Sequence, residues 1–335
     1  MTGPLKKILV TGGGGFLGSY IVNELLNRNY EVYSFSRSRY PELENLGVTC
    51  IMGSLSNYSD VEQATKGMDG VIHTAALAGI WGRWDDFYST NYIGTKNIID
   101  ACVQNGIKSV VYTSSPSVVF DGFDIKGSDE SLPYAKKHWC HYPVTKAMAE
   151  KLVLESSCDI LKTVALRPHL IWGPKDPHFI PRLVERSRSG KLKQIGDGSN
   201  LVDVIFVENA AKAHVDAYEK LVSNPSSIEG KAYFIGQEKP VKLWSFVNHL
   251  LEASGGVKVT KKIPLWLGYT AGAILEFLFS TFRVYKNEPM VTRFLSLQMA
   301  KSHYFSHNSA SKDFGYKPEV SYEKGLEKLK SFYAN

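Results

Sequence analysis

Cysteines are few in this sequence and follow no pattern. Its 335 residues include four of them, Cys50, Cys102, Cys140 and Cys158, and no two have CxxC spacing. Disulfide frameworks occur mainly in short secreted chains, and structural zinc sites need closely spaced pairs of ligands. We therefore expect neither a disulfide framework nor a metal site, and we expect a reducing compartment such as the cytoplasm.

Long blocks of like charge are also missing. The 39 lysine and arginine residues outnumber the 33 acidic residues and give a net charge of +6, but they are scattered along the chain. Chains that bind nucleic acid usually gather basic residues into runs or patches. No nucleic-acid partner is therefore expected, whereas a mild positive balance suits an anionic cofactor or substrate.

A leader-like apolar segment is absent from the first stretch, MTGPLKKILV, so no signal peptide is expected. One long apolar segment follows at residues 263–282. It is long enough to cross a bilayer, but Pro264, Glu276 and basic residues at both of its ends argue against a span. We expect this segment to cover an apolar pocket or to lie on a membrane surface as a peripheral contact.

The sequence does contain a regular alternation of short apolar runs and amphipathic stretches. Strands are expected at 6–10, 31–36, 48–52, 70–76, 109–115 and 163–168, and helices at 16–28, 60–66, 87–104 and from residue 142 onward. This alternation predicts an α/β fold with a doubly wound parallel sheet of the Rossmann type.

Loops rich in glycine, proline and aspartate begin after residue 169, and we expect the chain to return to the sheet at VDVIFV, residues 202–207. Residues 1–170 are thus expected to form the nucleotide-binding domain, with return segments near 201–237. Residues 171–200 and 238–335 are expected to form a smaller, mainly C-terminal lobe that binds the substrate.

A glycine-rich turn follows the first expected strand. In TGGGGFLG, residues 11–18, Gly12, Gly15 and Gly18 fit the pattern TGxxGxxG, and the next helix begins directly after them. Glycines allow the backbone to approach a pyrophosphate at a helix N-terminus, where free N–H groups favour anions. Such a pattern is weak alone but strong between a strand and a helix, so a dinucleotide site is expected here.

The end of the second expected strand indicates which dinucleotide is bound. An acidic residue there would hold the ribose 2′-hydroxyl of NAD, but the sequence reads Ser36, Arg37, Ser38, Arg39. Arg37 could pair with the 2′-phosphate of NADP(H) through charge-assisted hydrogen bonds. NADP(H) is therefore expected, with a solvated surface arginine as the alternative.

The stretch HYPVTK, residues 141–146, places a tyrosine and a lysine one helical turn apart. Pro143 suits the first position of a helix, where its missing N–H costs nothing. Ser115 ends a strand whose C-terminal edge should face a ligand. Tyr142 could then give a proton to an alkoxide while Lys146 lowers the tyrosine pKa and Ser115 holds the oxygen. A plain surface turn is the alternative.

Together with HTAA, NYIGTKN and LRPHLIWGP, these motifs resemble the extended short-chain dehydrogenases/reductases over most of the chain. The resemblance implies that Ser115, Tyr142 and Lys146 are catalytic and that Asn91 supports them. It further implies a set of cofactor-binding residues: Gly12, Gly15, Phe16, Leu17, Gly18, Ser36, Arg37, Ser54, Leu55, His73, Ala75, Ala76, Tyr142, Lys146 and Pro168. Ser54 stands where the family usually has an aspartate.

Within that family, SSPSVVFDG, HYPVTKAMAE and RPHLIWGPKDPH resemble the 3β-hydroxysteroid dehydrogenase branch, and most closely its bacterial reductases of 2-alkyl-3-oxoalkanoic acids in long-chain olefin biosynthesis. The resemblance implies NADPH-dependent reduction of a lipid-like β-keto acid to the 3-hydroxy acid. A β-lactone synthetase and a β-lactone decarboxylase are the partners that it implies. Three alternatives stay open: a 3β-hydroxysteroid or sterol-4-carboxylate dehydrogenase, a sugar-nucleotide epimerase, and a non-catalytic NADP-binding regulator.

A substrate of this kind needs an apolar pocket with a place for a carboxylate. The apolar candidates are Trp81, Trp84, Trp172, Phe179, Ile180 and the segment 263–282. The candidate carboxylate partners are His169, His178 and Arg182, and for each histidine a structural role is the stronger alternative. Whether the chain forms a homodimer stays open.

Overall fold

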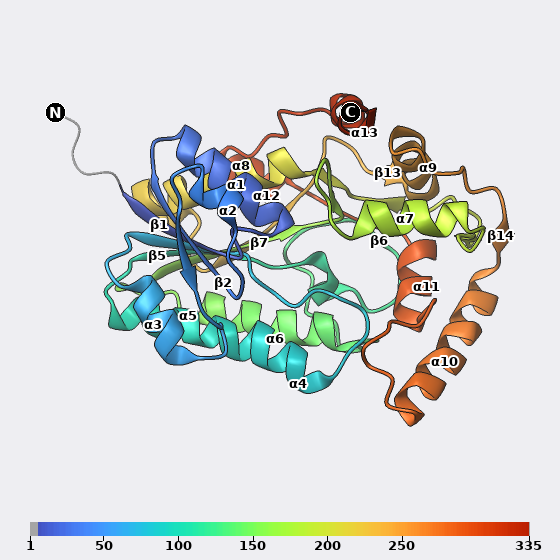
Figure 1. Cartoon of the computed structure of the whole chain (residues 1–335), viewed down its shortest axis with the longest axis horizontal. Helices are drawn as coiled ribbons and strands as arrows, with labels where there is room; N and C mark the ends of the chain where they lie inside the picture. The colour runs from blue at the N-terminus through green and yellow to red at the C-terminus, as the bar shows by residue number, and fades with distance from the viewer. Residues whose placement is uncertain (1–5, 335) are drawn as a thin grey trace.

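The computed structural model describes residues 6–334, and a seven-stranded parallel sheet forms its centre (Figure 1). The strands lie in the order β12-β7-β5-β4-β1-β2-β3. Their bounds are β1 Lys7–Thr11, β2 Glu31–Ser36, β3 Thr49–Met52, β4 Gly70–His73, β5 Ser109–Thr113, β7 Lys162–Pro168 and β12 Lys231–Ile235. Strand order reverses between β1 and β4, and ligands of such sheets bind at the carboxyl ends beside that point. The prediction of a doubly wound parallel sheet is confirmed.

Helices cover both faces of this sheet, as the strand–helix alternation requires (Figure 1). One face packs against α1 (Phe16–Asn27) and α8 (Val207–Ser223), and the other packs against α3 (Tyr58–Thr65), α5 (Gly94–Gln104) and α6 (His141–Glu155). Two apolar cores result, and the central strands are buried on both sides. This rigid double layer fixes the positions of the loops that follow β1, β2, β4, β5 and β7.

A smaller lobe lies beyond the carboxyl ends of the strands. Its helices are α7 (Phe179–Arg188), α9 (Leu243–Ala253), α10 (Leu265–Thr281), α11 (Arg293–Ala300) and α13 (Tyr322–Ala334). Its short strands are β6 Ile125–Ser128, β8 Ile171–Trp172, β9 Gln194–Ile195, β10 Leu201–Val202, β11 Ile205–Phe206, β13 Val241–Lys242, β14 Lys262–Ile263 and β15 His303–Phe305. The remaining elements are α2 Pro41–Glu44, α4 Trp84–Phe87, α12 Asn308–Phe314 and the 3-10 turns Pro116–Val119 and Pro225–Ser227.

Three local predictions need correction. Residues 202–207 do not return to the main sheet, because β10 joins the small sheet β13-β10-β15-β6 and β11 pairs with β8. The strand that does return is β12. The helix predicted at 87–104 is interrupted by a π-helix, Tyr88–Ile93. Finally, α6 begins at His141, so Pro143 is its third residue, where the missing N–H is still one of the unpaired N-terminal donors.

Candidate active site

Two positions in the turn between β1 and α1 require glycine, one because of its backbone conformation and one because of close packing. Gly12 has φ +71°, a left-handed conformation that favours glycine. A Cβ on Gly18 would lie 2.1 Å from the carbonyl oxygen of Gly12. The turn therefore brings its backbone N–H groups and the N-terminus of α1 to the carboxyl edge of the sheet. This arrangement can hold an anionic pyrophosphate.

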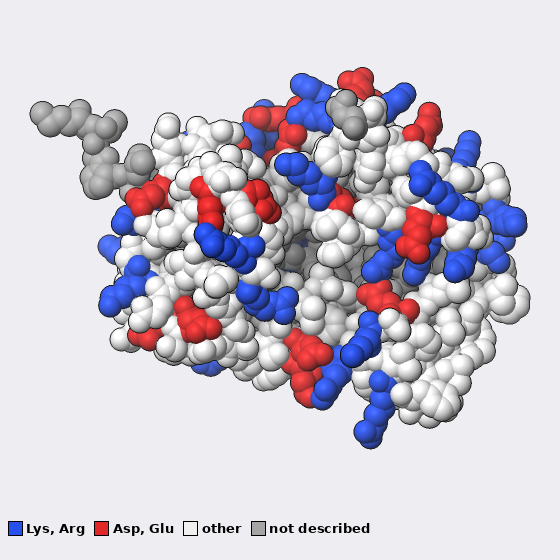
Figure 2. Space-filling view, viewed as in Figure 1, with Lys and Arg blue, Asp and Glu red and all other residues white. Residues whose placement is uncertain are grey.

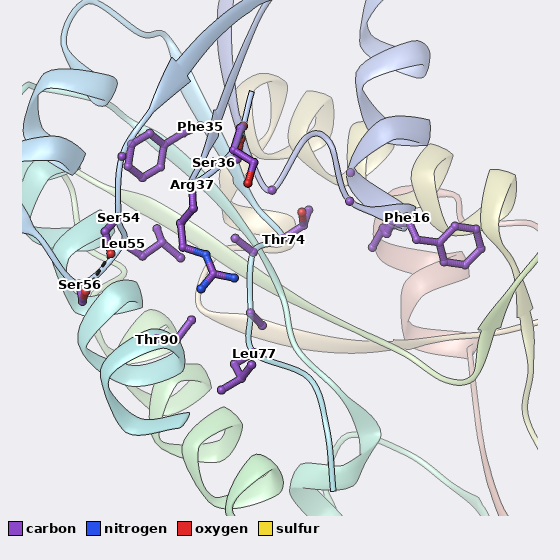
Figure 3. Close-up of a pocket in the computed structure, with 18 of the residues that line it drawn as sticks. Phe16, Phe35, Ser36, Arg37, Ser54, Leu55, Ser56, Thr74, Leu77 and Thr90 are labelled. Atoms are coloured by element: carbon purple, nitrogen blue, oxygen red, sulfur yellow. Dashed lines mark hydrogen bonds between the residues drawn. The ribbon is translucent and has the colours of Figure 1, made fainter. Parts of the chain in front are cut away.

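A cavity of about 690 Å³ runs from this turn across the ends of β2, β3 and β4 (Figure 3). Its walls include all of the predicted cofactor contacts of the glycine turn, of β2 and of the loops after β3 and β4, namely Gly12, Gly15, Phe16, Leu17, Gly18, Ser36, Arg37, Ser54, Leu55, Ala75 and Ala76. The Ser54 hydroxyl lies 2.9 Å from that of Ser56, which lines the same cavity. The structure thus brings these residues together around one elongated cavity.

Arg37 extends from the end of β2 into this cavity, between Leu55 and Thr74 in the view of Figure 3. Within residues 6–334 its guanidinium forms no ion pair. The neighbouring Arg39 differs, because its Nε and Nη2 both donate to Glu44, at 2.8 Å each. Arg37 is therefore the arginine of this pair whose charge stays available to an anionic ligand.

His73 does not line this cavity, although it was predicted to contact the cofactor. It is 1% exposed, and both of its ring nitrogens have partners. Nδ1 lies 2.6 Å from the Thr11 hydroxyl, and Nε2 lies 3.0 Å from the Thr95 hydroxyl, which itself donates to the Asn91 carbonyl. Burial lowers the pKa of His73 to about 3, and the charge of Lys146 acts in the same direction. His73 is thus a neutral brace between β1, β4 and α5.

A second cavity, of about 350 Å³, lies at the ends of β5 and β7. Ser115 and Tyr142 line it, and so does Pro168, which was predicted to contact the cofactor. Most of the remaining wall is apolar, with Ile80, Phe120, Phe294 and Phe305 among its residues. The loop after β4 passes along both cavities, with Ala75 to Leu77 on the first and Ala78 to Ile80 on the second.

Lys146 lies beneath Tyr142 on α6 and is 2% exposed. Its Nζ donates to the Thr113 carbonyl at 2.6 Å and lies 4.2 Å from the centroid of the Tyr112 ring. Burial lowers the pKa of Lys146 to about 7, opposed in part by the charge of Glu150. This ammonium group can therefore lose and regain its proton near neutral pH.

The pKa of Tyr142 departs from the prediction. Burial raises the pKa of Tyr142 to about 12, and a hydrogen bond with Ser115 lowers it only in part. In the protein alone, the lowering expected from Lys146 is therefore absent, and the phenol holds its proton at pH 7, which is the form that a proton donor requires.

Asn91 lies in the π-helix and is 1% exposed. Its side chain accepts from the Leu77 N–H at 2.7 Å and donates to the Leu77 carbonyl at 3.0 Å. It also donates to the Thr145 hydroxyl at 3.1 Å. Asn91 thereby fastens the loop after β4 to α6, so it supports the arrangement of both cavities.

Several predicted substrate contacts lie elsewhere. Trp172 and Ile180 are fully buried in the core of the lobe, where Trp172 packs on Phe206 and Phe246. Phe179 stacks on Phe246 in the same core. These three side chains therefore contribute to packing, and none of them lines the cavity of Ser115 and Tyr142.

The other candidates divide between surface and cavities. Arg182 is paired with Glu288 at 2.5 Å, and Trp84 stacks on Tyr88 at the surface. His178 lines the first cavity rather than the second, and Trp81 lines a third cavity against α10. His169 is the candidate that lies on the wall shared with Tyr142.

Helix α10 corresponds to the apolar segment 263–282. It packs on α11 through Gly268, Gly272 and Glu276, and the Glu276 carboxylate accepts from the N–H and Nε of Arg293, at 2.6 Å each. Leu265 and Tyr269 pack against buried apolar clusters, and many of the other side chains cover the third cavity or face solvent. The surface over α10 is largely white at the lower right of Figure 2. Among residues 6–334, no helix is long and apolar enough to cross a membrane.

Sequence reasoning missed several residues of these cavities. Ser56, Thr74, Ser89 and Thr90 line the first cavity, and Gln298 and His303 line the second. The first group lies next to predicted contacts and could have been found by extending those segments. No local pattern marks Gln298 and His303, which reach the cavity from more than 120 residues beyond β7.

The comparisons with known proteins agree with this geometry. A family model described as the 3-beta hydroxysteroid dehydrogenase/isomerase family matches residues 9–266. A 2-alkyl-3-oxoalkanoate reductase of Shewanella oneidensis is 45% identical over 334 residues, which covers 98% of this chain and 86% of that protein. The enzyme of the same name from Stenotrophomonas maltophilia is 46% identical and covers 97% and 98%.

A sterol-4-alpha-carboxylate 3-dehydrogenase, decarboxylating, of Homo sapiens is 38% identical, over 96% of this chain and 87% of that protein. Among solved structures, MoeE5 in complex with UDP-glucose and NAD superposes with a TM-score of 0.75 over 98% of both chains, at 24% identity, which shows a shared fold. The chain therefore belongs to the 3-beta hydroxysteroid dehydrogenase/isomerase family and is, like the relatives named above, an oxidoreductase.

Proposed function

We propose that this enzyme uses NADPH to reduce a 2-alkyl-3-oxoalkanoic acid to the 2-alkyl-3-hydroxyalkanoic acid, as a step of long-chain olefin biosynthesis. The observation that carries the proposal is the second cavity, where Ser115 and Tyr142 face a wall that is otherwise mainly apolar. The names of the two bacterial relatives support the substrate class. In this proposal residues 1–170, with return segments near 201–237, bind the cofactor, and the remainder forms the substrate lobe.

NADP(H) would lie along the first cavity and end in the second. The pyrophosphate would bind the glycine turn, and the adenosine part would lie between Arg37 and the loop of Ser54 and Leu55. The guanidinium of Arg37, which forms no ion pair within residues 6–334, favours the 2′-phosphate because the two groups can form charge-assisted hydrogen bonds. When bound in the reduced form, the nicotinamide supplies the hydride that reaches the keto carbon.

The residues of the chain supply the proton and hold the oxygen. Hydride addition places negative charge on the former keto oxygen, and the Tyr142 hydroxyl transfers its proton to that atom. The Ser115 hydroxyl donates a hydrogen bond to the same oxygen. With cofactor and substrate bound, the Lys146 ammonium group, which is buried one turn below, would stabilise the phenolate that Tyr142 leaves behind.

A sterol-4-carboxylate dehydrogenase is the second candidate, and the 38% identity to the human enzyme of that name favours it. Both functions share one pair of groups, a 3-hydroxy acid and its β-keto acid. A substrate panel distinguishes them. NADPH oxidation would be followed with a 2-alkyl-3-oxo acid, and NAD(P)+ reduction with a sterol-4-carboxylate and with the stable 2-alkyl-3-hydroxy acid. Turnover of the sterol without turnover of either fatty acid would refute the proposal.

The 3-hydroxy acid is the material that a β-lactone synthetase consumes, and a β-lactone decarboxylase would act after it, so we propose these two enzymes as functional partners. We further propose that α10 makes a peripheral contact with a membrane surface. Trp266, Phe277 and Phe282 are 67%, 69% and 74% exposed, and basic residues flank the helix at both ends. Aromatic side chains with basic neighbours are typical of helices that lie on anionic lipid.

A further inference from the structure

Two histidines far apart in sequence meet at the wall of the second cavity. His169 directly follows β7 and His303 begins β15, and the ring atoms His169 Nε2 and His303 Nδ1 lie 2.5 Å apart. Both side chains are buried, with 9% and 2% exposure, and both line the cavity that Tyr142 and Ser115 share. The next residue, Leu170, has φ +45°, a strained backbone conformation that clusters at functional sites.

The hydrogen bonds assign the protons of this pair. His303 Nε2 lies 2.8 Å from the backbone carbonyl of Gln298, which only accepts, so His303 carries its proton on Nε2. Neutral His303 then accepts at Nδ1, and His169 Nε2 must donate to it. Neutral His169 therefore has an unprotonated Nδ1. The hydrogen bonds thus run from the Gln298 carbonyl through His303 to His169, and His169 Nδ1 is the acceptor left at the end of this series, on a residue of the cavity wall.

We propose that His169 binds the carboxyl group of the substrate through Nδ1 and takes up a proton from solvent as it does so, and that His303 positions it. This inference rests on the proposed function, and it names the group that recognises the acid. The imidazolium formed on binding would donate Nδ1–H to the carboxylate, while Nε2–H keeps its bond to His303. A neighbouring hydroxyl, Ser114, lines the same cavity, is 4% exposed and has no hydrogen-bond partner within residues 6–334. It offers a second donor to the same ligand.

The surroundings of His169 and His303 favour the neutral form of both rings when no carboxylate is bound. Burial holds the pKa of His169 well below its usual range, and the charges of His303 and His307 act in the same direction. Burial lowers the pKa of His303, and the charges of Asp203 and Asp124 partly oppose that shift. Tyr142, the titratable group on the facing wall, is protonated at neutral pH. A bound carboxylate would therefore supply the negative charge that makes protonation of His169 favourable.

Such a contact would also protect the substrate. A β-keto acid loses CO2 when the electrons of the bond to its carboxyl carbon move toward the keto group. A hydrogen-bond donor on the carboxylate oxygens holds that charge in place. His169 would thereby favour hydride addition over decarboxylation in a cavity whose Tyr142 hydroxyl activates the same keto oxygen.

The test measures proton uptake and discrimination between an acid and its ester. The stable 2-alkyl-3-hydroxy acid is titrated at pH 7.5 into the enzyme saturated with NADPH, which cannot oxidise it, in two buffers that differ in heat of ionisation. We expect wild type to take up about one proton per site and His169→Gln to take up almost none. Loss of a hydrogen bond to a charged group should raise KM for the 3-oxo acid roughly 10- to 150-fold, while KM for its methyl ester changes little.

Further variants separate positioning from structure. His303→Gln can still donate to Gln298 and accept from His169, so it should retain most of the discrimination that His303→Leu loses. His249→Gln, a surface histidine bonded to Tyr322, is the control and should behave as wild type. Absence of proton uptake by wild type, or an unchanged acid KM in His169→Gln, would overturn the inference even if a second variant fails to fold. Wild-type enzyme that binds the hydroxy acid with proton uptake but reduces no oxo acid would instead refute the proposed function.

Discussion

Replacement of Arg37 by alanine should reduce the use of NADPH without disturbing the fold. The Arg37 side chain is exposed and forms no ion pair within the described residues, so its removal breaks no internal interaction. The loss falls on the bond to the 2′-phosphate. A hydrogen bond to a charged group contributes ~1.5–3 kcal/mol, which corresponds to a roughly 10- to 150-fold loss in kcat/KM for NADPH. NADH lacks this phosphate, so its kcat/KM should change little.

The matched control is Arg39→Ala, two residues away. Arg39 is paired with Glu44, so the Arg39→Ala variant should leave the ratio of kcat/KM for NADPH to kcat/KM for NADH unchanged. Initial rates with varied NADPH and NADH, at fixed salt concentration, provide the comparison. An equal loss with both cofactors in Arg37→Ala, or the same effect in Arg39→Ala, would refute the assignment of Arg37 to the 2′-phosphate.

Three further predictions follow from the site. Gly18→Ala should abolish cofactor binding, because its Cβ would lie 2.1 Å from the Gly12 carbonyl oxygen; retained binding in fluorescence titration would contradict this packing. The unfolding free energy of wild type minus that of Lys146→Met should rise from pH 7 to pH 10. The reason is that the lysine releases its proton at a pKa of about 7 in the folded protein and near ~10.4 in the unfolded chain. Urea unfolding at both pH values measures this difference, and a difference that does not change with pH would refute the lowered pKa of Lys146. Phe277→Ser with Phe282→Ser should weaken binding to anionic vesicles in a flotation assay, and equal flotation of both proteins would exclude α10 as the contact.

Much of the wall of the first cavity could be predicted because its signals are local. The glycine turn, the end of β2 and the loop after β3 each lie within a few residues of a strand that was recognisable by its apolar run. The spacing of Tyr142 and Lys146 likewise follows from one helical turn. In these segments, short-range steric and hydrogen-bonding rules determine where the side chains point.

The errors arose where distant segments decide the outcome. Residues 202–207 have the alternation of a strand, but the buried Asp203 carboxylate accepts from the Phe305 N–H at 2.7 Å and ties this segment to β15. An apolar side chain such as Trp172 suits a substrate pocket and a protein core equally well, and in the structure it lies in the core of the lobe. The partner of His169 is 134 residues away, so no pattern near His169 could have revealed it.

The most direct test of the account is the rate of reduction in Tyr142→Phe. The phenyl ring keeps the shape of the cavity and removes the proton donor, so NADPH should still bind while kcat falls by at least ~10²–10⁴, the range expected for loss of a general acid. NADPH affinity and single-turnover oxidation with a 2-alkyl-3-oxo acid would be measured on the same preparation. Intact NADPH affinity with a collapsed rate is the predicted result. A rate close to that of wild type would show that another group donates the proton, and would contradict the role of Tyr142 on which the mechanism depends.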